Sequence, residues 1–416
     1  MKKIINKINF EKTYYFALLI FAFMLPLSRA TNSLFIVLFI LLLLLQGNYK
    51  KHFARVKESP LAITILFFIG FTFFSLLWTE DLGFGLNHKR LYIPWIAIFA
   101  IALNVKKEQI LSIISAFIMG MIVSEILSYG MFFELWQIKG YGKEYPSPFM
   151  MHIDYSIFLA FTAIILLNRL LSKSYNKKEK LIILFFFITI TGNLFINEGR
   201  TGQLAFLVGI FATVFIHYKI NLKSILTSFV LIVIIFSSAY IFSDKFQTRI
   251  HAAKSDIEKI MQGQLNSSLG IRVAMYFVAT DIIKANPIVG VGVGDYKITA
   301  KKALEKNDHG FSKKVVKFIP KYHFHSQYLN VLVQGGIIGL LIFLMIFYQF
   351  TKLLISDPEL KELSLLIIIV MMTAFIAEPL LLKQFTNVLF VLFTGLFLGA
   401  SLDSSSGSEN NKISQQ

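Results

Sequence analysis

The stretch 222–243, LKSILTSFVLIVIIFSSAYIFS, has a single charged residue and contains the uninterrupted apolar run Leu231–Phe236. A helix that crosses the hydrocarbon core of a bilayer needs about 20 mostly apolar residues. The strands of a transmembrane barrel would instead alternate apolar and polar residues over about ten positions. Neither this run nor Leu41–Leu45 alternates. The stretch therefore predicts a membrane-spanning α-helix.

Comparable stretches recur along the whole chain. Of its 416 residues, 56% are hydrophobic and 16% are charged, whereas a water-soluble domain has about 25% charged residues. We therefore expect an all-α polytopic membrane protein with about twelve transmembrane helices, and we exclude an ordinary soluble enzyme. The absence of cysteine excludes disulfides, thiol catalysis and Cys-ligated zinc. The expected spans lie near 13–28, 32–46, 60–78, 91–104, 109–131, 151–171, 180–197, 201–218, 222–243, 326–350, 362–380 and 385–402.

The net charge of +17 is carried largely by short basic clusters between the apolar runs. Lys and Arg in short loops mark the cytoplasmic side of a membrane protein. If the twelve spans alternate, every cluster falls on one side, so we expect both termini to be cytoplasmic. Such clusters favour anionic membrane lipids as partners, and not nucleic acid. The clusters are Lys2, Lys3, Lys7 and Lys12; Lys50, Lys51, Arg55 and Lys57; Lys106 and Lys107; Lys173, Lys177, Lys178 and Lys180; Lys219 and Lys223; and Lys352 and Lys361.

The unequal spacing of the spans divides the chain into four parts. We expect transmembrane helices 1–9 in residues 1–243, a periplasmic cap loop in 244–325, helices 10–12 in 326–402 and a disordered cytoplasmic tail in 403–416. Within the cap loop, Gly270–Ala285 has apolar residues at helical spacing before Asn286-Pro287, which stops a helix. Residues 298–306 predict a second, basic amphipathic helix.

Two arginines on the expected outer face are candidate functional residues. Arg200 lies in Asn197-Glu198-Gly199-Arg200-Thr201-Gly202, where the seventh and eighth spans meet. A charged residue near membrane depth is costly and indicates function by default, although pairing with Glu198 or snorkelling to the interface would also explain it. Arg272 follows in the cap loop, where a solvated helix residue is the alternative interpretation.

Histidines supply the other candidate chemistry. His323 and His325 stand just before the tenth span and are candidate metal ligands, but the sequence offers no third or fourth ligand, so we expect no metal. One of them can instead act as a general base near neutral pH. His152 and Asp154, at the start of the sixth span, fit an acceptor-binding role or a structural pair. Glu125 and Glu378 also lie within or at the end of spans, and we assign them no role.

The glycine-rich segment 287–296, Pro-Ile-Val-Gly-Val-Gly-Val-Gly-Asp-Tyr, superficially suggests a dinucleotide fingerprint. That motif has the spacing G-x-G-x-x-G between a strand and a helix, whereas the spacing here is G-x-G-x-G after Asn-Pro. Close packing of backbone, or close approach to a ligand, explains the glycines better.

Three of these features, in this order, resemble the O-antigen ligase and O-antigen polymerase superfamily of bacterial envelope proteins. They are Arg200-Thr-Gly at the start of a span, the stretch from Arg272 to Asn286-Pro-Ile-Val-Gly-Val-Gly-Val-Gly-Asp295, and His325-Ser-Gln-Tyr-Leu followed by Gly335-Gly-Ile-Ile-Gly339. The resemblance is specific from about residue 195 to residue 345. Ser326 stands where the family usually has Asn.

The resemblance implies a glycosyltransferase of the bacterial inner membrane that needs no cofactor. Such enzymes move a glycan from undecaprenyl pyrophosphate to a sugar hydroxyl on the periplasmic face. The family's essential histidine maps to His325, as general base, and its paired arginines map to Arg200 and Arg272, as pyrophosphate ligands. Further candidate substrate contacts are His323, Arg249, His152, Asp154 and Tyr328.

The acceptor distinguishes the possible reactions. Transfer to lipid A–core would make the protein an O-antigen ligase, which we favour, and transfer to another lipid-linked repeat would make it a polymerase. A protein-glycosylating transferase is a further possibility within the same chemistry. A transporter or flippase of lipid-linked glycan is the alternative from another class, and it predicts internal repeats with polar groups near the bilayer midplane.

Overall fold

The computed structural model describes residues 9–138 and 141–413. Within these ranges, 10 helices are long and apolar enough to cross a membrane. They are α3 (Arg29–Gln46), α5 (Pro60–Phe74, continued to Trp78 by η1), α8 (Lys107–Phe132), α9 (His152–Leu171), α10 (Lys177–Ile196), α11 (Arg200–Tyr218), α12 (Leu222–Phe242), α17 (Gln327–Thr351), α18 (Pro358–Ala377) and α19 (Gln384–Ile413). The prediction of an all-α polytopic membrane protein is confirmed.

The two other expected spans are shorter helices. Helix α2 (Phe10–Met24) has 15 residues and α7 (Ile96–Asn104) has 9, whereas a perpendicular span needs about 20. Pro26 follows α2, and Pro94 lies in the 3₁₀ turn η2 (Ile93–Trp95) that precedes α7, and proline interrupts a regular helix. Helix α7 packs against α3 and α19, and residues 97–103 are each at most 8% exposed, so protein and not lipid surrounds most of this helix.

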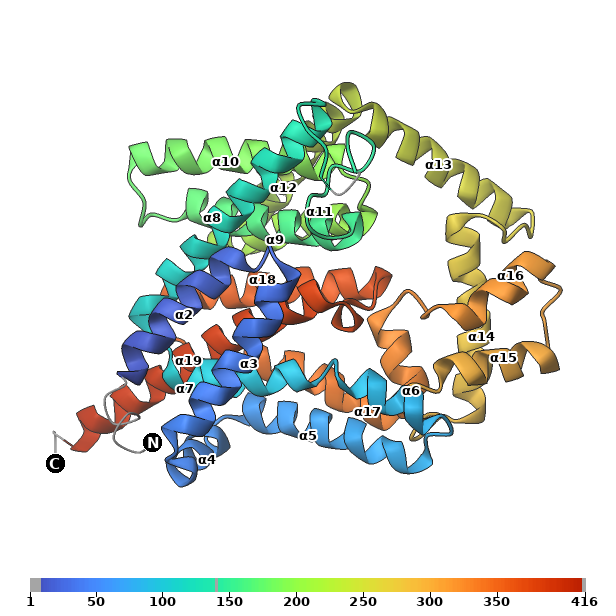
Figure 1. Cartoon of the computed structure of the whole chain (residues 1–416). Helices are drawn as coiled ribbons and strands as arrows, with labels where there is room; N and C mark the ends of the chain where they lie inside the picture. Colours follow the sequence, from blue (N-terminus) through green and yellow to red (C-terminus); the bar gives the residue numbers. More distant parts are fainter. Residues whose placement is uncertain (1–8, 139–140, 414–416) are drawn as a thin grey trace.

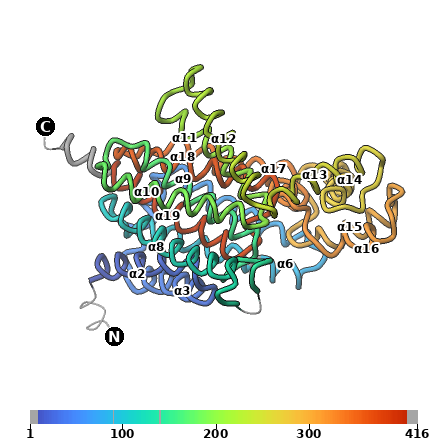
Figure 2. Tube along the Cα trace, turned by 90° about the horizontal axis from the view of Figure 1, so that it is seen from above, coloured from blue at the N-terminus to red at the C-terminus, as the bar shows by residue number. Residues whose placement is uncertain are grey.

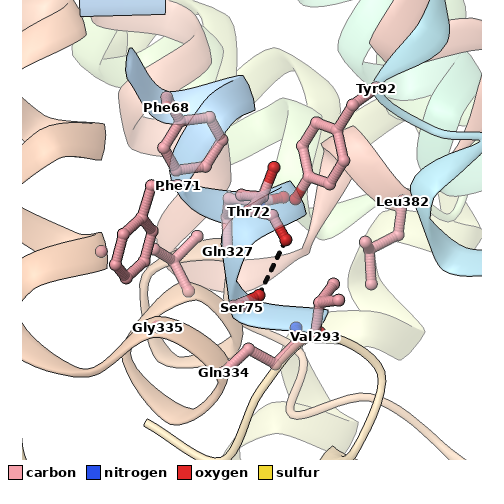
Figure 3. Close-up of a pocket in the computed structure, with 12 residues that line it drawn as sticks. Phe68, Phe71, Thr72, Ser75, Tyr92, Val293, Gln327, Gln334, Gly335 and Leu382 are labelled. Carbon is pink, nitrogen blue, oxygen red and sulfur yellow. Dashed lines mark hydrogen bonds between the residues drawn. The ribbon is translucent and has the colours of Figure 1, made fainter. Parts of the chain in front are cut away.

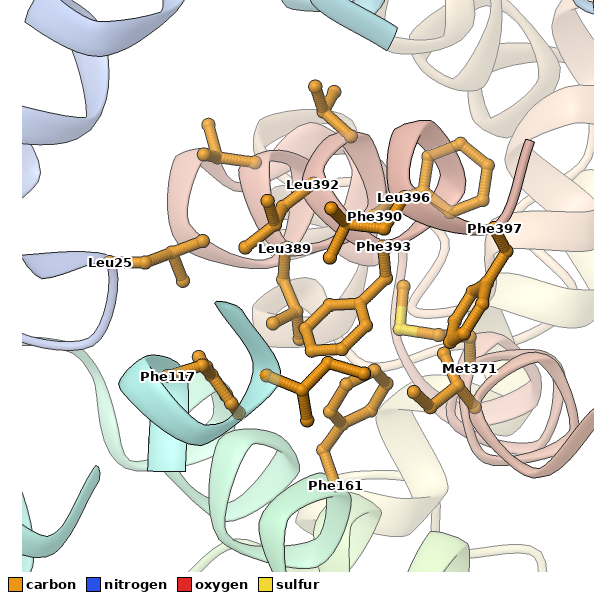
Figure 4. Close-up of a cluster of buried hydrophobic side chains, with 14 of the residues drawn as sticks. Leu25, Phe117, Phe161, Met371, Leu389, Phe390, Leu392, Phe393, Leu396 and Phe397 are labelled. Atoms are coloured by element: carbon orange, nitrogen blue, oxygen red, sulfur yellow. The ribbon is translucent and has the colours of Figure 1, made fainter. Parts of the chain in front are cut away.

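The centre of the bundle is formed by α9 and α19. In the most apolar 18-residue stretch of each helix, 89% of α9 and 94% of α19 are buried inside the protein, whereas only 11% of α12 is buried. Aromatic rings from three helices meet there: the centroid of Phe393 lies 4.7 Å from that of Phe161 and 5.4 Å from that of Phe117 (Figure 4). These rings pack α8, α9 and α19 against one another. The low burial of α12 fits a helix at the lipid-facing edge of the bundle.

Four further helices, α13 to α16, gather at one end of the bundle (Figure 1). In Figures 1 and 2, α2 begins and α19 ends at one end, and α13 to α16 lie at the opposite end. These helices are α13 (Asp244–Met261), α14 (Ser268–Ala285), α15 (Tyr296–Lys306) and α16 (Lys313–Phe318, followed by η3, Ile319–Lys321); α4 (Tyr49–Lys57), α6 (Leu82–Lys89) and η4 (Leu380–Leu382) complete the helices described. The stretches 270–285 and 298–306, expected to be helical, lie within α14 and α15.

The helices at this end have a hydrophobic core of their own. Met275 and Val278 of α14 pack with Tyr296 of α15 and with Phe324, all at most 5% exposed, in a cluster distinct from that of the bundle. Helix α13 is tied to the start of α14, because the backbone N–H of Leu269 donates to a carboxylate oxygen of Asp256 at 3.2 Å. The end of the molecule that carries α14 is therefore a folded unit.

The glycine-rich segment 287–296 packs its backbone against α17. Gly290 has φ +67°, and its neighbour Val291 donates its N–H to the carbonyl of Val333 at 3.0 Å. Helix α17 is kinked at Gly336, with φ +60°, where Ile337 donates to the carbonyl of Pro287 at 2.9 Å. The space left between this segment, α5 and α17 is about 20 Å³ (Figure 3), room for about one water. A dinucleotide does not fit there, and the glycines serve close backbone packing.

We expect Gly290→Ala to destabilise the protein by more than the backbone strain alone. A Cβ at this position would lie 2.5 Å from the carbonyl carbon of Gln334, whereas at Gly310, which has φ +69°, it would meet nothing within 4 Å. Gly310→Ala is therefore a matched control, and we expect it to lower the free energy of unfolding by about 1 kcal/mol, the cost of a left-handed alanine. Gly290→Ala adds a clash with backbone atoms to this cost. Thermal unfolding in detergent checks this, and equal losses at the two positions would contradict the packing role.

The C-terminal tail differs from the expectation. Helix α19 runs to Ile413, so residues 403–413 are helical where the sequence predicts a disordered tail. Extending an existing helix by one residue costs far less than nucleating a new one, and the buried part of α19 provides the nucleus. Residues 414–416 of the predicted tail lie outside the described residues.

Candidate functional site

A buried carboxylate, Glu378, organises the polar residues at the end of the bundle that carries α14. Helix α18 ends at Ala377, so Glu378 stands at its C-cap directly before Pro379, and its side chain is 1% exposed. Its Oε2 lies 3.1 Å from Nδ1 of His325 and 3.7 Å from a guanidinium nitrogen of Arg272. Its Oε1 lies 2.9 Å from Nζ of Lys383 and 4.0 Å from Nε2 of His323.

The charge of Glu378 is stabilised by these neighbours. Burial by itself raises the pKa of a carboxyl, because it penalises the ionised form. The hydrogen bond with His325 and the positive charge of Lys383 outweigh burial and lower the pKa of Glu378 to about 2. Glu378 is therefore ionised at neutral pH, in contact with an imidazole and two cationic side chains.

The backbone holds His325 in a strained conformation. His325 has φ +43°, a left-handed conformation that costs a non-glycine residue about 1–3 kcal/mol and is concentrated at functional sites. Ser326 follows as the N-cap of α17, and its hydroxyl accepts a hydrogen bond from the N–H of Leu329 at 3.4 Å. Because an ionised carboxylate only accepts hydrogen bonds, Nδ1 of His325 carries a proton, and Nε2 is the ring nitrogen that is left to exchange one with a substrate.

The neighbouring His323 has a different environment. Its ring centroid is 4.7 Å from that of His325, and its Nδ1 accepts the backbone N–H of His325 at 3.4 Å. Burial, together with the charge of His325, lowers the pKa of His323 to about 4. His323 is therefore neutral at neutral pH and helps to fix the backbone that carries His325.

Three arginines come together beside this cluster. Arg272 of α14 donates to the carbonyl of Ala377 at 3.2 Å, and the charges that act on Arg200 include those of Arg249 and Arg272. Arg249 forms an ion pair with Glu198. The structure gives Glu198 this partner, and not Arg200 as in the alternative interpretation from the sequence. Three guanidinium groups close together offer the forked donors that bind a phosphate or carboxylate.

The other predicted residues have distinct places. Asp154, which is 5% exposed, pairs with Lys383 at 3.3 Å and not with His152. The hydroxyl of Tyr328 donates to the carbonyl of Met372 at 2.9 Å, which ties α17 to α18, and the structure does not bring it to Glu378. Glu125 accepts a hydrogen bond from Thr189 at 3.0 Å, between α8 and α10.

Sequence reasoning left Glu378 without a role and overlooked Lys383. The signal for Glu378 was present, since a carboxylate at the end of an apolar span indicates function. Its partners were not apparent, because His325 is 53 positions away along the chain. Lys383 looked like an isolated charge in a short loop.

Glu378 also completes a possible metal-ligand set that the sequence did not offer. Ligand atoms of His323, His325 and Glu378 lie within 4.8 Å of one another. Lys383 and Arg272 approach the same carboxylate, so a divalent cation would be repelled by two positive charges already in place. The arrangement fits proton transfer at His325 better than metal binding.

The comparisons with known proteins concern the middle of the chain. A family model described as O-antigen ligase matches residues 184–344. The matched region includes Arg200, Arg249, Arg272 and both histidines, and it ends before Glu378. A search of the curated proteins gives no match.

Proposed function

We propose that this chain, a multi-pass membrane protein whose residues 184–344 belong to the O-antigen ligase superfamily, transfers a glycan from undecaprenyl pyrophosphate to a sugar hydroxyl of lipid A–core on the periplasmic face of the bacterial inner membrane. The observation that carries the proposal is the contact of His325 with ionised Glu378 beside the guanidinium group of Arg272. This arrangement combines a base and an anion site, which are the two requirements of the reaction.

The arginines act on the leaving group. A lipid pyrophosphate concentrates negative charge, and that charge grows as the bond to the sugar breaks. Arg200 and Arg272 hold its oxygens through charge-assisted, forked hydrogen bonds, and Arg249 adds positive charge nearby. Stabilising the charge that develops in the transition state lowers the barrier without a metal ion.

His325 acts on the acceptor. Its Nε2 takes the proton of the acceptor hydroxyl as the oxygen bonds to the anomeric carbon, and the bond from that carbon to the pyrophosphate oxygen breaks with its electron pair. Glu378 positions the imidazole through Nδ1 and stabilises the imidazolium that forms. A single displacement of this kind inverts the anomeric centre.

Two readings compete with this proposal. An O-antigen polymerase uses the same donor chemistry with a lipid-linked repeat as acceptor, and we favour the ligase because the chain has one moderately long outer loop. A flippase would need polar groups near the bilayer midplane, whereas Glu378, His325 and Arg272 lie at or beyond the ends of the spans.

Purified protein in proteoliposomes tests the function directly. The protein is supplied with an undecaprenyl-pyrophosphate-linked glycan and with lipopolysaccharide that lacks O-antigen, and the products are separated by size. A new glycosidic bond to lipid A–core supports the ligase, and extension of the lipid-linked glycan alone supports the polymerase. Movement of the donor across the membrane without a new bond would overturn the proposal in favour of a flippase.

Lysine in place of Arg200 or Arg272 tests the forked contact. Lysine keeps the charge but loses the planar pair of donors, so we expect kcat/KM for the donor to fall about 10- to 100-fold at either position, the effect of one charge-assisted hydrogen bond of about 1.5–3 kcal/mol. Arg55→Lys is the matched control, because Arg55 lies in α4 at the opposite end of the bundle (Figure 1). A fully active Arg200→Lys/Arg272→Lys protein would exclude the clamp.

A further inference from the structure

The largest cavity among those described lies beside the Glu378 cluster and contains none of the three arginines. Its volume is about 900 Å³, within the range of small-molecule sites. It is bounded by the turn between α2 and α3, by the segment that leads into α9, and by the start of α19. Its lining includes Arg29, Tyr141, Tyr145, His152, Asp154 and Lys383.

We propose that this cavity binds the acceptor sugar, an inference that rests on the proposed glycan transfer. Lys383 lines the cavity and lies 2.9 Å from Oε1 of Glu378, whose other oxygen contacts His325. Lys383, in the wall of the cavity, is therefore linked to His325 through Glu378. Arg272 contacts Glu378 from α14, and none of Arg200, Arg249 and Arg272 lines the cavity.

The two sides of the cluster suit the two substrates of a displacement reaction. The donor must place its pyrophosphate among the guanidinium groups, because the leaving group needs positive charge. The acceptor hydroxyl must reach His325 from another direction, since attack and departure occur on opposite sides of the anomeric carbon. The cavity lined by Lys383 adjoins the cluster through the contact of Lys383 with Glu378.

The lining has the chemistry that recognises a sugar ring. Tyr141 and Tyr145 meet edge to face with centroids 6.3 Å apart, and the ring of Tyr145 lies 6.5 Å from that of His152. Aromatic faces pack against the apolar C–H face of a pyranose and lose little conformational entropy. Asp154 and His152 offer hydrogen-bond partners to hydroxyl groups at the ring edge. Site chemistry and position both point to a carbohydrate.

Tyr145→Ala tests the assignment, with initial rates measured against acceptor and donor separately. Tyr145 is 46% exposed, so its removal leaves the fold intact. We expect the KM for a lipid A–core acceptor to rise about 3- to 10-fold, the effect of an aromatic contact of about 0.5–1.5 kcal/mol, with the KM for the donor unchanged. Tyr348→Ala is the matched control, since Tyr348 is 55% exposed in the second half of α17 and should change neither constant.

A binding titration separates this inference from the proposed function. Deacylated core oligosaccharide is titrated into the wild-type protein and into Tyr145→Ala without donor, so that no transfer is required. Weaker binding of the oligosaccharide by Tyr145→Ala than by the wild-type protein supports the cavity as its site, even if no glycosidic bond is ever formed. Equal binding by the two proteins, or a rise in the KM for the donor instead of the acceptor, would overturn the assignment.

Discussion

We expect His325→Ala to lower the rate of glycan transfer about 10²- to 10⁴-fold, which is the contribution of a general base. Without the imidazole, the acceptor hydroxyl has no group that takes its proton as the new bond forms. The fold survives, because Glu378 still contacts Lys383 at 2.9 Å and Arg272 at 3.7 Å and is not left as an unpaired buried charge. Transfer in proteoliposomes and thermal unfolding of the same preparation measure the two effects.

His323→Ala provides the control within the same cluster. The pKa of His323 is lowered to about 4, and so weakly basic an imidazole has little driving force to accept a proton at neutral pH. We therefore expect a much smaller loss than at His325, caused by a less firmly held backbone. A near-normal rate in His325→Ala, or an equal loss in His323→Ala, would show that the base is assigned to the wrong residue.

The sequence was a good guide to the fold because the membrane imposes one strong rule. Backbone polar groups in hydrocarbon must be satisfied within a helix, so apolar runs such as Leu231–Phe236 indicate helices directly. The rule gives no information on spans that are sheltered by protein. Helix α7 has 9 residues and is buried among other helices, and hydropathy alone could not separate it from a full span.

The site was partly predictable for a related reason. Arg200, Arg272 and His325 stood out because charged or titratable residues are costly near a membrane. Glu378 was equally visible, yet its role depends on its contact with His325, 53 positions earlier in the chain, which no local pattern contains. The cavity lined by Lys383 could not be foreseen, because it forms only where three separate loops meet.

Glu378→Gln should separate positioning from charge. The amide keeps nearly the same shape and can still accept the hydrogen bond from Nδ1 of His325, but it no longer offsets the positive charge of the imidazolium. We expect kcat to fall about 10²-fold or more, as when an orienting carboxylate is neutralised, with little change in either KM.

A combined substitution shows whether Glu378 acts through His325 or only supports the site. The double variant His325→Ala/Glu378→Gln extends the test, because residues that act as one unit give non-additive losses. If Glu378 works through His325, the double variant is no slower than His325→Ala. If the two losses instead multiply, Glu378 supports the site through Lys383 and Arg272 alone, since its contacts with both remain available without the imidazole.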